Sequence, residues 1–266
     1  MTELLQTKLH IPKVQPGVIL RPALTARLAE GLHRRLTLLA AAAGFGKTTL
    51  VATWPHSLPA DLPIGWLTLD EHDNDPQRFL VYLTAALAPG VGQAHTGVAT
   101  IEARLILLLN QWAAGERPVV LVLDDYHLIE QPAIDTAITF LIDHAPPTLH
   151  LLMTTRVDPA LPLSRWRARQ QLVAIRAQDL RFTRAEMATL LQKTWQLPIT
   201  EADVARLDAQ TEGWVAAGYK NQEIADELII SLNTVRYHTK NLYGKLGVNK
   251  RTQAVAQAQT LGLLSL

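Results

Sequence analysis

The sequence predicts an α/β domain with a parallel sheet covered by helices on both faces, followed by an all-helical carboxy-terminal domain. Short apolar runs alternate with helical segments as far as Leu180, and only helical patterns follow. The 266 residues are enough for one large domain and a smaller one. Two modules are therefore expected.

The first two strand and helix pairs are expected within residues 36–87. An apolar run over 36–42 predicts a strand, and a helix over 47–54 follows it and stops at Pro55. A second strand over 64–69 leads through an acidic turn into a helix over 76–87. This helix begins with a proline, which suits a first helical turn because its missing N–H costs nothing there.

The same alternation continues to residue 175. The run over 119–123 consists only of valine and leucine, which is typical of a central strand buried on both faces. The other expected elements are a loop over 89–100, helices over 101–114 and 133–144, and strands over 149–154 and 171–175.

Helices over 184–195 and 201–210 then follow without strands, so a domain boundary is expected between Gln178 and Gly218. We predict an α/β domain over 1–180, a helical extension and junction over 181–218, and an all-helical domain over 219–266.

The composition predicts a folded protein and excludes sites that need cysteine. With 48% hydrophobic and 18% charged residues the chain is expected to fold. It has no cysteine, which excludes disulfides, thiolate zinc sites and cysteine nucleophiles. The amino terminus lacks the apolar region of a signal peptide, and no run approaches the roughly 18 apolar residues of a membrane span. We therefore expect a cytoplasmic protein without a membrane partner.

A glycine-containing turn between the first strand and helix matches the second half of a Walker A loop. Its glycines let backbone N–H groups turn toward phosphate oxygens. Lys47 would reach the β and γ phosphates of ATP, and the Thr48 hydroxyl would bind Mg²⁺. The full pattern has glycine where this chain has Ala41, and the alternative is an ordinary glycine turn. The predicted cofactor-binding residues of the loop are Gly44, Phe45, Gly46, Lys47, Thr48 and Thr49.

Two carboxylates follow the buried run over 119–123, at the strand end where α/β sheets bind ligands. We expect Asp124 to hold Mg²⁺. Asp125 is a candidate catalytic residue that orients or deprotonates an attacking water, and a capping carboxylate is the alternative. Arg156, after the strand over 149–154, is a candidate for a γ-phosphate contact or a surface arginine.

Other polar residues are expected to have no site role. An acidic cluster after the second strand lacks the glycine and terminal glutamate of a calcium loop, which predicts a solvated turn. Three histidines are too scattered for a metal site or a catalytic dyad, so packing or surface roles are expected. These residues are Asp70, Glu71, Asp73 and Asp75, and His10, His127 and His238.

The carboxy-terminal segment predicts a helix-turn-helix unit that binds DNA. Residues 221–228 place apolar side chains on one helical face, and after a turn Ser231 caps a second helix over 232–246. Between Tyr219 and Thr252 six basic residues outnumber three acidic ones, a local charge of +3. The outward residues Arg236, Tyr237, Lys240 and Asn241 are candidates for contact with bases or phosphates, and an amphipathic hairpin without nucleic acid is the alternative.

Taken together, these motifs resemble the MalT-type, ATP-binding LuxR regulators, a branch of the STAND ATPases. The resemblance rests on Gly44 to Thr49, on Leu123-Asp-Asp-Tyr-His-Leu128, on the Thr155-Arg156 step and on the terminal helices. It implies a P-loop NTPase fold with ATP and Mg²⁺ as ligands, self-association, binding of double-stranded DNA, and RNA polymerase as a candidate partner. It also implies that Thr234 and Lys245 contact the DNA backbone.

The chain departs from that family at one place. Members carry a long helical-repeat sensor region between the ATPase and the DNA-binding unit, and this chain has none; residues 211–215 run directly into 217–222. The first helix of the DNA-binding domain is therefore atypical, and Thr211 and Glu212 would replace apolar core residues.

The predicted function is a transcriptional regulator in which ATP binding acts as a switch. Two alternatives stay open: a P-loop ATPase whose terminal helices mediate protein contacts, and a non-activating internal-deletion remnant of a larger regulator. Whether ATP is hydrolysed, as a weak ATPase would, also stays open.

Overall fold

A computed structural model of the chain describes residues 4–14, 18–87, 100–114 and 118–189, together with 201, 204–205 and 240. The chain divides into two compact units. The first comprises Met1–Val14, Arg21–Ala42 and Gly46–Asp179, and the second Gln15–Leu20, Ala43–Phe45 and Leu180–Leu266. The first unit holds the sheet.

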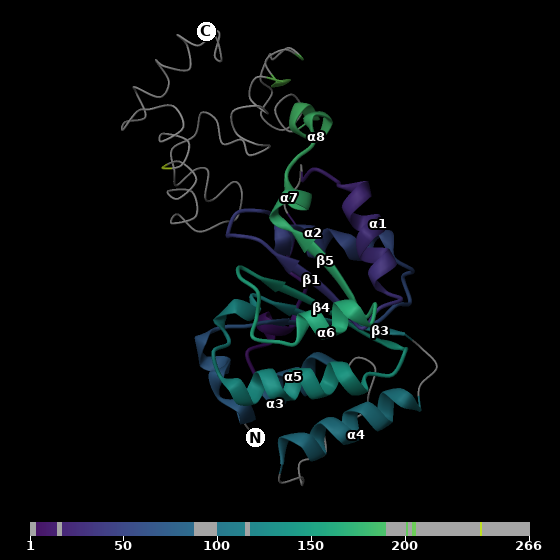
Figure 1. Cartoon of the computed structure of the whole chain (residues 1–266), viewed down its shortest axis with the longest axis vertical. Coiled ribbons are helices and arrows are strands. Elements are labelled where there is room, and N and C mark those ends of the chain that lie inside the picture. The colour runs from purple at the N-terminus through teal and green to yellow at the C-terminus, as the bar shows by residue number, and fades with distance from the viewer. Residues whose placement is uncertain are drawn as a thin grey trace. The chain divides into compact units, whose positions relative to one another are not determined.

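A five-stranded parallel sheet forms the centre of the first unit, with the strand order β2-β3-β4-β1-β5 (Figure 1). All residues of β1, β3 and β4 are buried, as expected for apolar runs in the middle of a parallel sheet. The strands are β1 (Leu36–Ala40), β2 (Ile64–Thr68), β3 (Val119–Asp124), β4 (Leu149–Thr155) and β5 (Leu172–Arg176).

Helices connect the strands and cover the sheet. They are α1 (Pro22–Gly31), α2 (Lys47–Thr53), α3 (Pro76–Leu87), α4 (Ile101–Ala113), α5 (Pro132–His144), α6 (Leu163–Ala168) and α7 (Ala177–Leu180). Short 3-10 turns are η1 (Gln6–Leu9), η2 (Trp54–Ser57), η3 (Glu71–Asn74) and η5 (Tyr126–Leu128). The expected strands and the helices between them are confirmed, whereas α1, α6 and α7 were not predicted.

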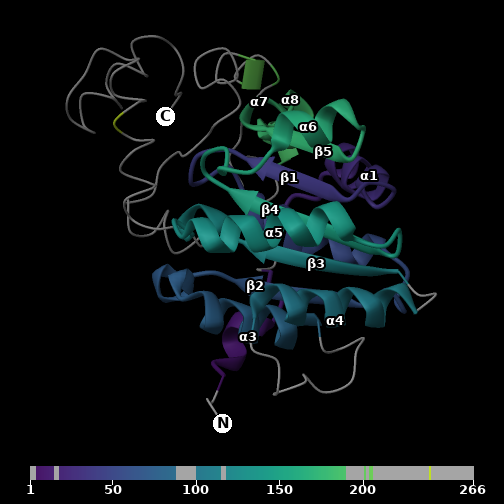
Figure 2. The same ribbon diagram turned by 60° about the horizontal axis from the view of Figure 1, so that its bottom comes forward.

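The two faces of the sheet are covered by different helices. Apolar residues of α3, α4, α5 and α6 form one continuous core with alternate strand residues such as Leu38, Leu121 and Leu151. On the opposite face, Gly31 of α1 lies against Thr37, and the beginning of α2 lies against Asp124. The predicted architecture of a parallel sheet between two helical layers is therefore confirmed (Figure 2).

Gly65 shows how closely α3 approaches the sheet. A Cβ atom built on this glycine of β2 would lie 2.3 Å from the carbonyl oxygen of Ala86 in α3. Any side chain would collide with backbone there, so the close packing of α3 on β2 requires glycine.

The strand order creates a reversal point at β1. From β1 the chain passes to β2 at the edge of the sheet and returns through β3 and β4, and then β5 forms on the other side of β1. In such sheets ligands bind beyond the carboxyl ends of the strands near the reversal point. This edge carries the ends of β1, β3 and β4.

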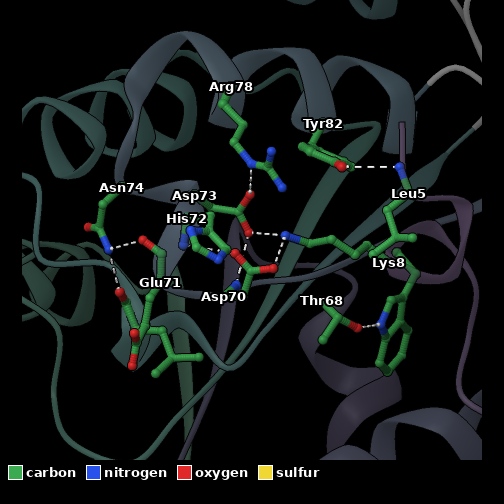
Figure 3. A network of polar contacts seen from close by, with 12 residues as sticks. Leu5, Lys8, Thr68, Asp70, Glu71, His72, Asp73, Asn74, Arg78 and Tyr82 are labelled. Carbon is green, nitrogen blue, oxygen red and sulfur yellow. Dashed lines mark hydrogen bonds and ion pairs between the residues drawn. The ribbon is translucent and has the colours of Figure 1, made fainter. Parts of the chain in front are cut away.

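A buried cation of the amino-terminal segment forms ion pairs with acidic residues that follow β2. The Lys8 ammonium, 6% exposed, forms ion pairs with the fully buried Asp73 and, at 3.0 Å, with Asp70 (Figure 3). Arg78 pairs with Asp73 from α3, and the Tyr82 ring lies 4.7 Å from the Lys8 nitrogen. The prediction of a solvated acidic turn is thus wrong for Asp73, because a cation from another part of the chain pairs with it.

In the second unit, α8 (Arg184–Thr189) begins with a capping box. The Glu186 side chain accepts a hydrogen bond from the Thr183 N–H, and the Thr183 hydroxyl accepts one from the Glu186 N–H. The remainder of the helix predicted over 184–195, and most of the one predicted over 201–210, lies outside the described residues. Within the described ranges, none of the helices is long and apolar enough to cross a membrane.

Candidate functional site

The loop after β1 turns sharply through two glycines. Gly44 has φ 83° and Gly46 has φ 70°, a left-handed conformation that side chains disfavour. A Cβ on Gly46 would meet nothing within 4 Å, so the backbone conformation and not space requires glycine there. Gly46 is the residue before α2, and its carbonyl accepts the first helical bond, from Leu50. The turn thereby places Lys47 at the beginning of the helix.

The Lys47 ammonium is buried and points back over the loop. It donates hydrogen bonds to the carbonyl oxygens of Ala41 at 2.8 Å and Ala42 at 3.1 Å. Burial lowers its pKa, although Asp125 and Asp124 favour the charged form. Such a cation gains most from an anionic ligand, because little water is available to solvate it.

Asp124 ends β3 as a buried carboxylate surrounded by hydroxyl groups. Thr154 on β4 donates to its Oδ1 at 2.6 Å, and the Thr48 hydroxyl lies 3.0 and 3.1 Å from its two oxygens. Burial raises the pKa of Asp124 to about 6, and the charge of Asp125 adds to the increase. Hydroxyl and carboxylate oxygens converge here in the way that Mg²⁺ prefers for its ligands.

Asp125 follows directly in the left-handed conformation, with φ 61°. Its N–H donates to the Thr154 hydroxyl at 2.9 Å, so Thr154 joins both acids to β4. The Asp125 carboxylate lies 3.7 Å from Nδ1 of His127, and Arg156 is exposed after β4. Arg156 acts electrostatically on both Lys47 and His127, which shows that these charged groups share one region.

The structure brings together most of the residues predicted for the nucleotide site. Lys47, Thr48 and Asp124 meet at the carboxyl edge of the sheet, with Asp125 and Arg156 beside them. Thr49 lies in the first turn of α2. Gly44 has the left-handed conformation of the loop, and Phe45 follows it in the chain. The roles assigned to all these residues remain predictions.

Three residues of this region were not predicted. Thr154 bridges the two acids, His127 lies next to Asp125, and Asn74 holds the loop that follows them. The position of Thr154 two residues before Arg156, at the end of an expected strand, was the only available signal. His127 was expected in a packing or surface role, and its side chain is buried beside Asp125.

Most residues predicted to contact DNA lie outside the described part of the chain. Lys240 is described as an exposed helical residue. The other candidates, for which the structure gives no placement, are Thr234, Arg236, Tyr237, Asn241 and Lys245.

The sheet order and the glycine loop after β1 give the first unit the fold of P-loop NTPases. The chain is similar to a signal transduction ATPase with numerous domains and a tetratricopeptide repeat sensor from Pyrococcus horikoshii, with a TM-score of 0.55 and 12% identity over 82% of this chain and 33% of that one. A Walker-type ATPase of Pyrococcus abyssi matches with a TM-score of 0.50 and 14% identity over 94% of this chain and 75% of that one.

Sequence relatives then give a closer class. The chain is 36% identical over 226 residues to the HTH-type transcriptional regulator MalT of Yersinia enterocolitica and to that of Serratia proteamaculans. Residues 213–258 match the family described as bacterial regulatory proteins, luxR family. The chain is thus similar to MalT over this alignment, has a P-loop NTPase fold and carries a segment that matches the luxR family, which confirms the predicted resemblance. The alignments cover 80% of this chain and 24% of the length of these relatives.

Proposed function

We propose that the chain is a transcriptional regulator that binds Mg-ATP in its first unit and double-stranded DNA through its carboxy-terminal segment. One observation carries the nucleotide part: the Thr48 hydroxyl meets the buried Asp124 carboxylate beside the Lys47 ammonium. The luxR-family match over residues 213–258 supports the DNA part on the same chain. The MalT relatives bear the name of transcriptional regulators.

The residues present fit Mg-ATP. Thr48 and Asp124 offer oxygen ligands for Mg²⁺, and Lys47 offers a buried cation for phosphate oxygens. Arg156 is an exposed guanidinium, able to make two parallel hydrogen bonds to a phosphate. Mg-ATP would supply the negative charge and the divalent cation that this set of groups lacks.

Hydrolysis is a separate question from binding. Asp125 is held by Thr154 and lies beside His127, so it is a candidate for orienting a water molecule. A switch needs only a difference in affinity between two states of the protein, and does not need rapid turnover. We therefore propose nucleotide binding as the primary activity, with a weak ATPase as its extension.

On the DNA side, Arg236 and Lys240 lie four residues apart and are proposed to contact bases or phosphates, with Tyr237 and Asn241 nearby in the chain. Thr234 and Lys245 are proposed as backbone contacts, which position the helix without reading sequence. Self-association and contact with RNA polymerase are further proposals that follow from the family resemblance of the sequence.

Thermal melting tests the nucleotide site. A saturating ligand stabilises a folded protein by about 2.7 kcal/mol at one hundred times its Kd. Mg-ATP should therefore raise the melting temperature of the wild-type chain, and Lys47→Ala should remove the increase. Lys13→Ala, which changes an exposed lysine, should keep it. A wild-type chain that melts at the same temperature with saturating Mg-ATP would overturn the proposed site.

Fluorescence anisotropy tests the DNA part. Duplexes selected by the wild-type chain from a randomised pool serve as probe. Substitution of both Arg236 and Lys240 by alanine should weaken binding and reduce the salt slope by about 1 for each lost phosphate contact. The control removes two exposed arginines near α6, Arg167 and Arg169. Equal affinities and salt slopes for all three proteins would favour the competing function, an ATPase whose terminal helices contact protein.

A further inference from the structure

His127 is a buried histidine whose ring nitrogens are both left without a hydrogen-bond partner within the described part of the chain. Its side chain is only one-tenth exposed. Buried polar atoms in native proteins almost always have a partner, and each exception calls for an explanation. Because the ring lies beside the nucleotide site, a ligand of that site is the natural partner to consider.

Hydrogen bonds hold the chain in place before and after His127. The N–H of Asp125 binds the Thr154 hydroxyl, and the Tyr126 hydroxyl donates to Asp135 at 2.7 Å. After η5, the Asn74 side chain donates to the Leu128 carbonyl at 2.8 Å, and its oxygen accepts from the N–H groups of residues 130 and 131. His127 therefore occupies a fixed position three residues beyond Asp124.

His127 lies among charges of both signs. Its Nδ1 lies 3.7 Å from the Asp125 carboxylate, which is too far for a hydrogen bond. Burial has the largest effect in lowering the pKa of His127; the charge of Asp125 opposes this change, and the charges of Arg156 and Lys47 add to it. A neutral imidazole results, which can donate one N–H to a phosphate oxygen.

The same geometry indicates which part of a nucleotide reaches the ring. In a P-loop site the lysine and the Mg²⁺ ligands lie at the β and γ phosphates. His127 lies three residues after Asp124 at the same end of the strand. The charges of Lys47 and Arg156 act on its ring. The ring is thus placed near the terminal phosphate.

We propose that His127 donates a hydrogen bond to the terminal phosphate of bound ATP and thereby distinguishes ATP from ADP. The proposal rests on the proposed nucleotide site. The loop held by Asn74 and Thr154 is then the element that responds to the γ phosphate, because its own buried imidazole gains a partner only in the triphosphate state.

Affinities for Mg-ADP and for the magnesium complex of a non-hydrolysable β,γ-imido analogue of ATP test the proposal. In His127→Ala the affinity for the analogue should fall about tenfold, while the affinity for Mg-ADP should stay unchanged. His127→Gln, whose amide can donate a hydrogen bond, should recover part of the loss. His150→Gln is the matched control, because His150 is also buried with one unpartnered nitrogen but lies near the amino end of β4.

Imidazole NMR spectra of the wild-type chain give a second readout that does not depend on a variant. The His127 signals should shift with the ATP analogue and remain nearly unchanged with Mg-ADP. An unchanged ratio of the two affinities in His127→Ala, or equal shifts with both nucleotides, would overturn the role of His127 alone. A wild-type chain that binds neither nucleotide would overturn the nucleotide site, and this proposal with it.

Discussion

Thr154 gives the two acids at the end of β3 their different environments. Its hydroxyl accepts from the Asp125 N–H and donates to Asp124, so its single hydrogen is directed toward Asp124. Hydroxyl donors from Thr154 and Thr48 orient the Asp124 carboxylate without neutralising its charge. This explains why burial still raises the pKa of Asp124 despite these hydrogen bonds, and why a divalent cation fits beside it.

Asp124→Asn should distinguish the stabilisation by Mg²⁺ from the stabilisation by the nucleotide itself. The amide keeps an oxygen that accepts from both threonines, but it loses the charge that would bind Mg²⁺. We expect the extra stabilisation by Mg²⁺ over that by nucleotide alone to disappear. Melting curves with ATP in the presence of Mg²⁺ or of EDTA measure it, with Asp61→Asn, at an exposed acid, as control. A Mg²⁺ effect of wild-type size in Asp124→Asn would exclude Asp124 as the ligand.

His150 should make the protein sensitive to acid. Burial lowers its pKa to about 4, and its Nδ1 lies 2.8 Å from the Arg34 carbonyl. In the unfolded chain it takes up a proton near pH 6.5, whereas in the folded chain it stays neutral, so stability is lost as the pH falls below 6.5. Between pH 7 and pH 5 the free energy of unfolding should fall by about 2 kcal/mol because of His150.

His150→Gln should remove that component, since glutamine does not titrate. The free energy of unfolding, measured by urea denaturation at pH 7, 6 and 5, should fall less steeply in the variant than in the wild type. Other titrating groups contribute equally to both proteins and cancel in the comparison. Curves that run parallel from pH 7 to 5 would show that His150 can be protonated in the folded state.

At the scale of elements, the turn η3 connects the amino-terminal segment to the proposed nucleotide site. Asp73 and Asp70 hold Lys8 of η1 (Figure 3). Asn74 of the same turn holds the loop that carries Asp125 and His127. Asp73 also accepts from the Asp70 N–H and closes a capping box. One short acidic turn therefore holds both the amino-terminal segment and the loop that follows β3.

Lys8→Met should destabilise the first unit strongly. Removing one partner of a buried ion pair leaves a buried charge without compensation, at a typical cost of about 3–5 kcal/mol. Arg78 still faces Asp73 and should limit the loss. Adding Asp73→Asn to Lys8→Met should recover part of the stability, because the uncompensated charge is gone. Chemical denaturation of both single variants and the double variant measures this coupling, and additive effects would contradict it.

The sheet was predictable because its strands are short apolar runs separated by prolines, glycines and acidic turns. The run over 119–123 is one example, and its burial on both faces follows from its composition alone. Helices α1, α6 and α7 escaped prediction because each buries only a few residues, such as Leu24 in α1 and Trp166 in α6, and α6 and α7 are also short. A short helix gives too few turns for a periodic pattern.

The site was predictable only where its residues follow sequence motifs. Lys47, Thr48 and Asp124 could be placed together because carboxyl ends of parallel strands share one edge of a sheet. Thr154 could not, since its contact with Asp124 depends on the register of β3 and β4. Asp73 was misjudged for a similar reason, because Lys8, its partner, is separated from it by 65 positions in the chain.

At the scale of the whole molecule, the proposed switch requires coupling between two binding events on one chain. Coupling is a free energy shared by both sites, so ATP must change DNA affinity by the same factor by which DNA changes ATP affinity. Self-association driven by ATP would provide such coupling, because two DNA-binding segments held together bind a two-part site more tightly than one.

We therefore expect the ATP analogue with Mg²⁺ to tighten DNA binding by the wild-type chain, and DNA to tighten binding of the analogue equally. Typical coupling energies of about 1–3 kcal/mol correspond to factors of about 5 to 150. Anisotropy with labelled DNA and with labelled nucleotide measures the two factors, and light scattering reports the mass of the complex. Lys47→Ala should bind DNA with the affinity of the nucleotide-free wild type. A chain that binds both ligands without mutual effect would retain two activities but no switch, as expected for a non-activating remnant of a larger regulator.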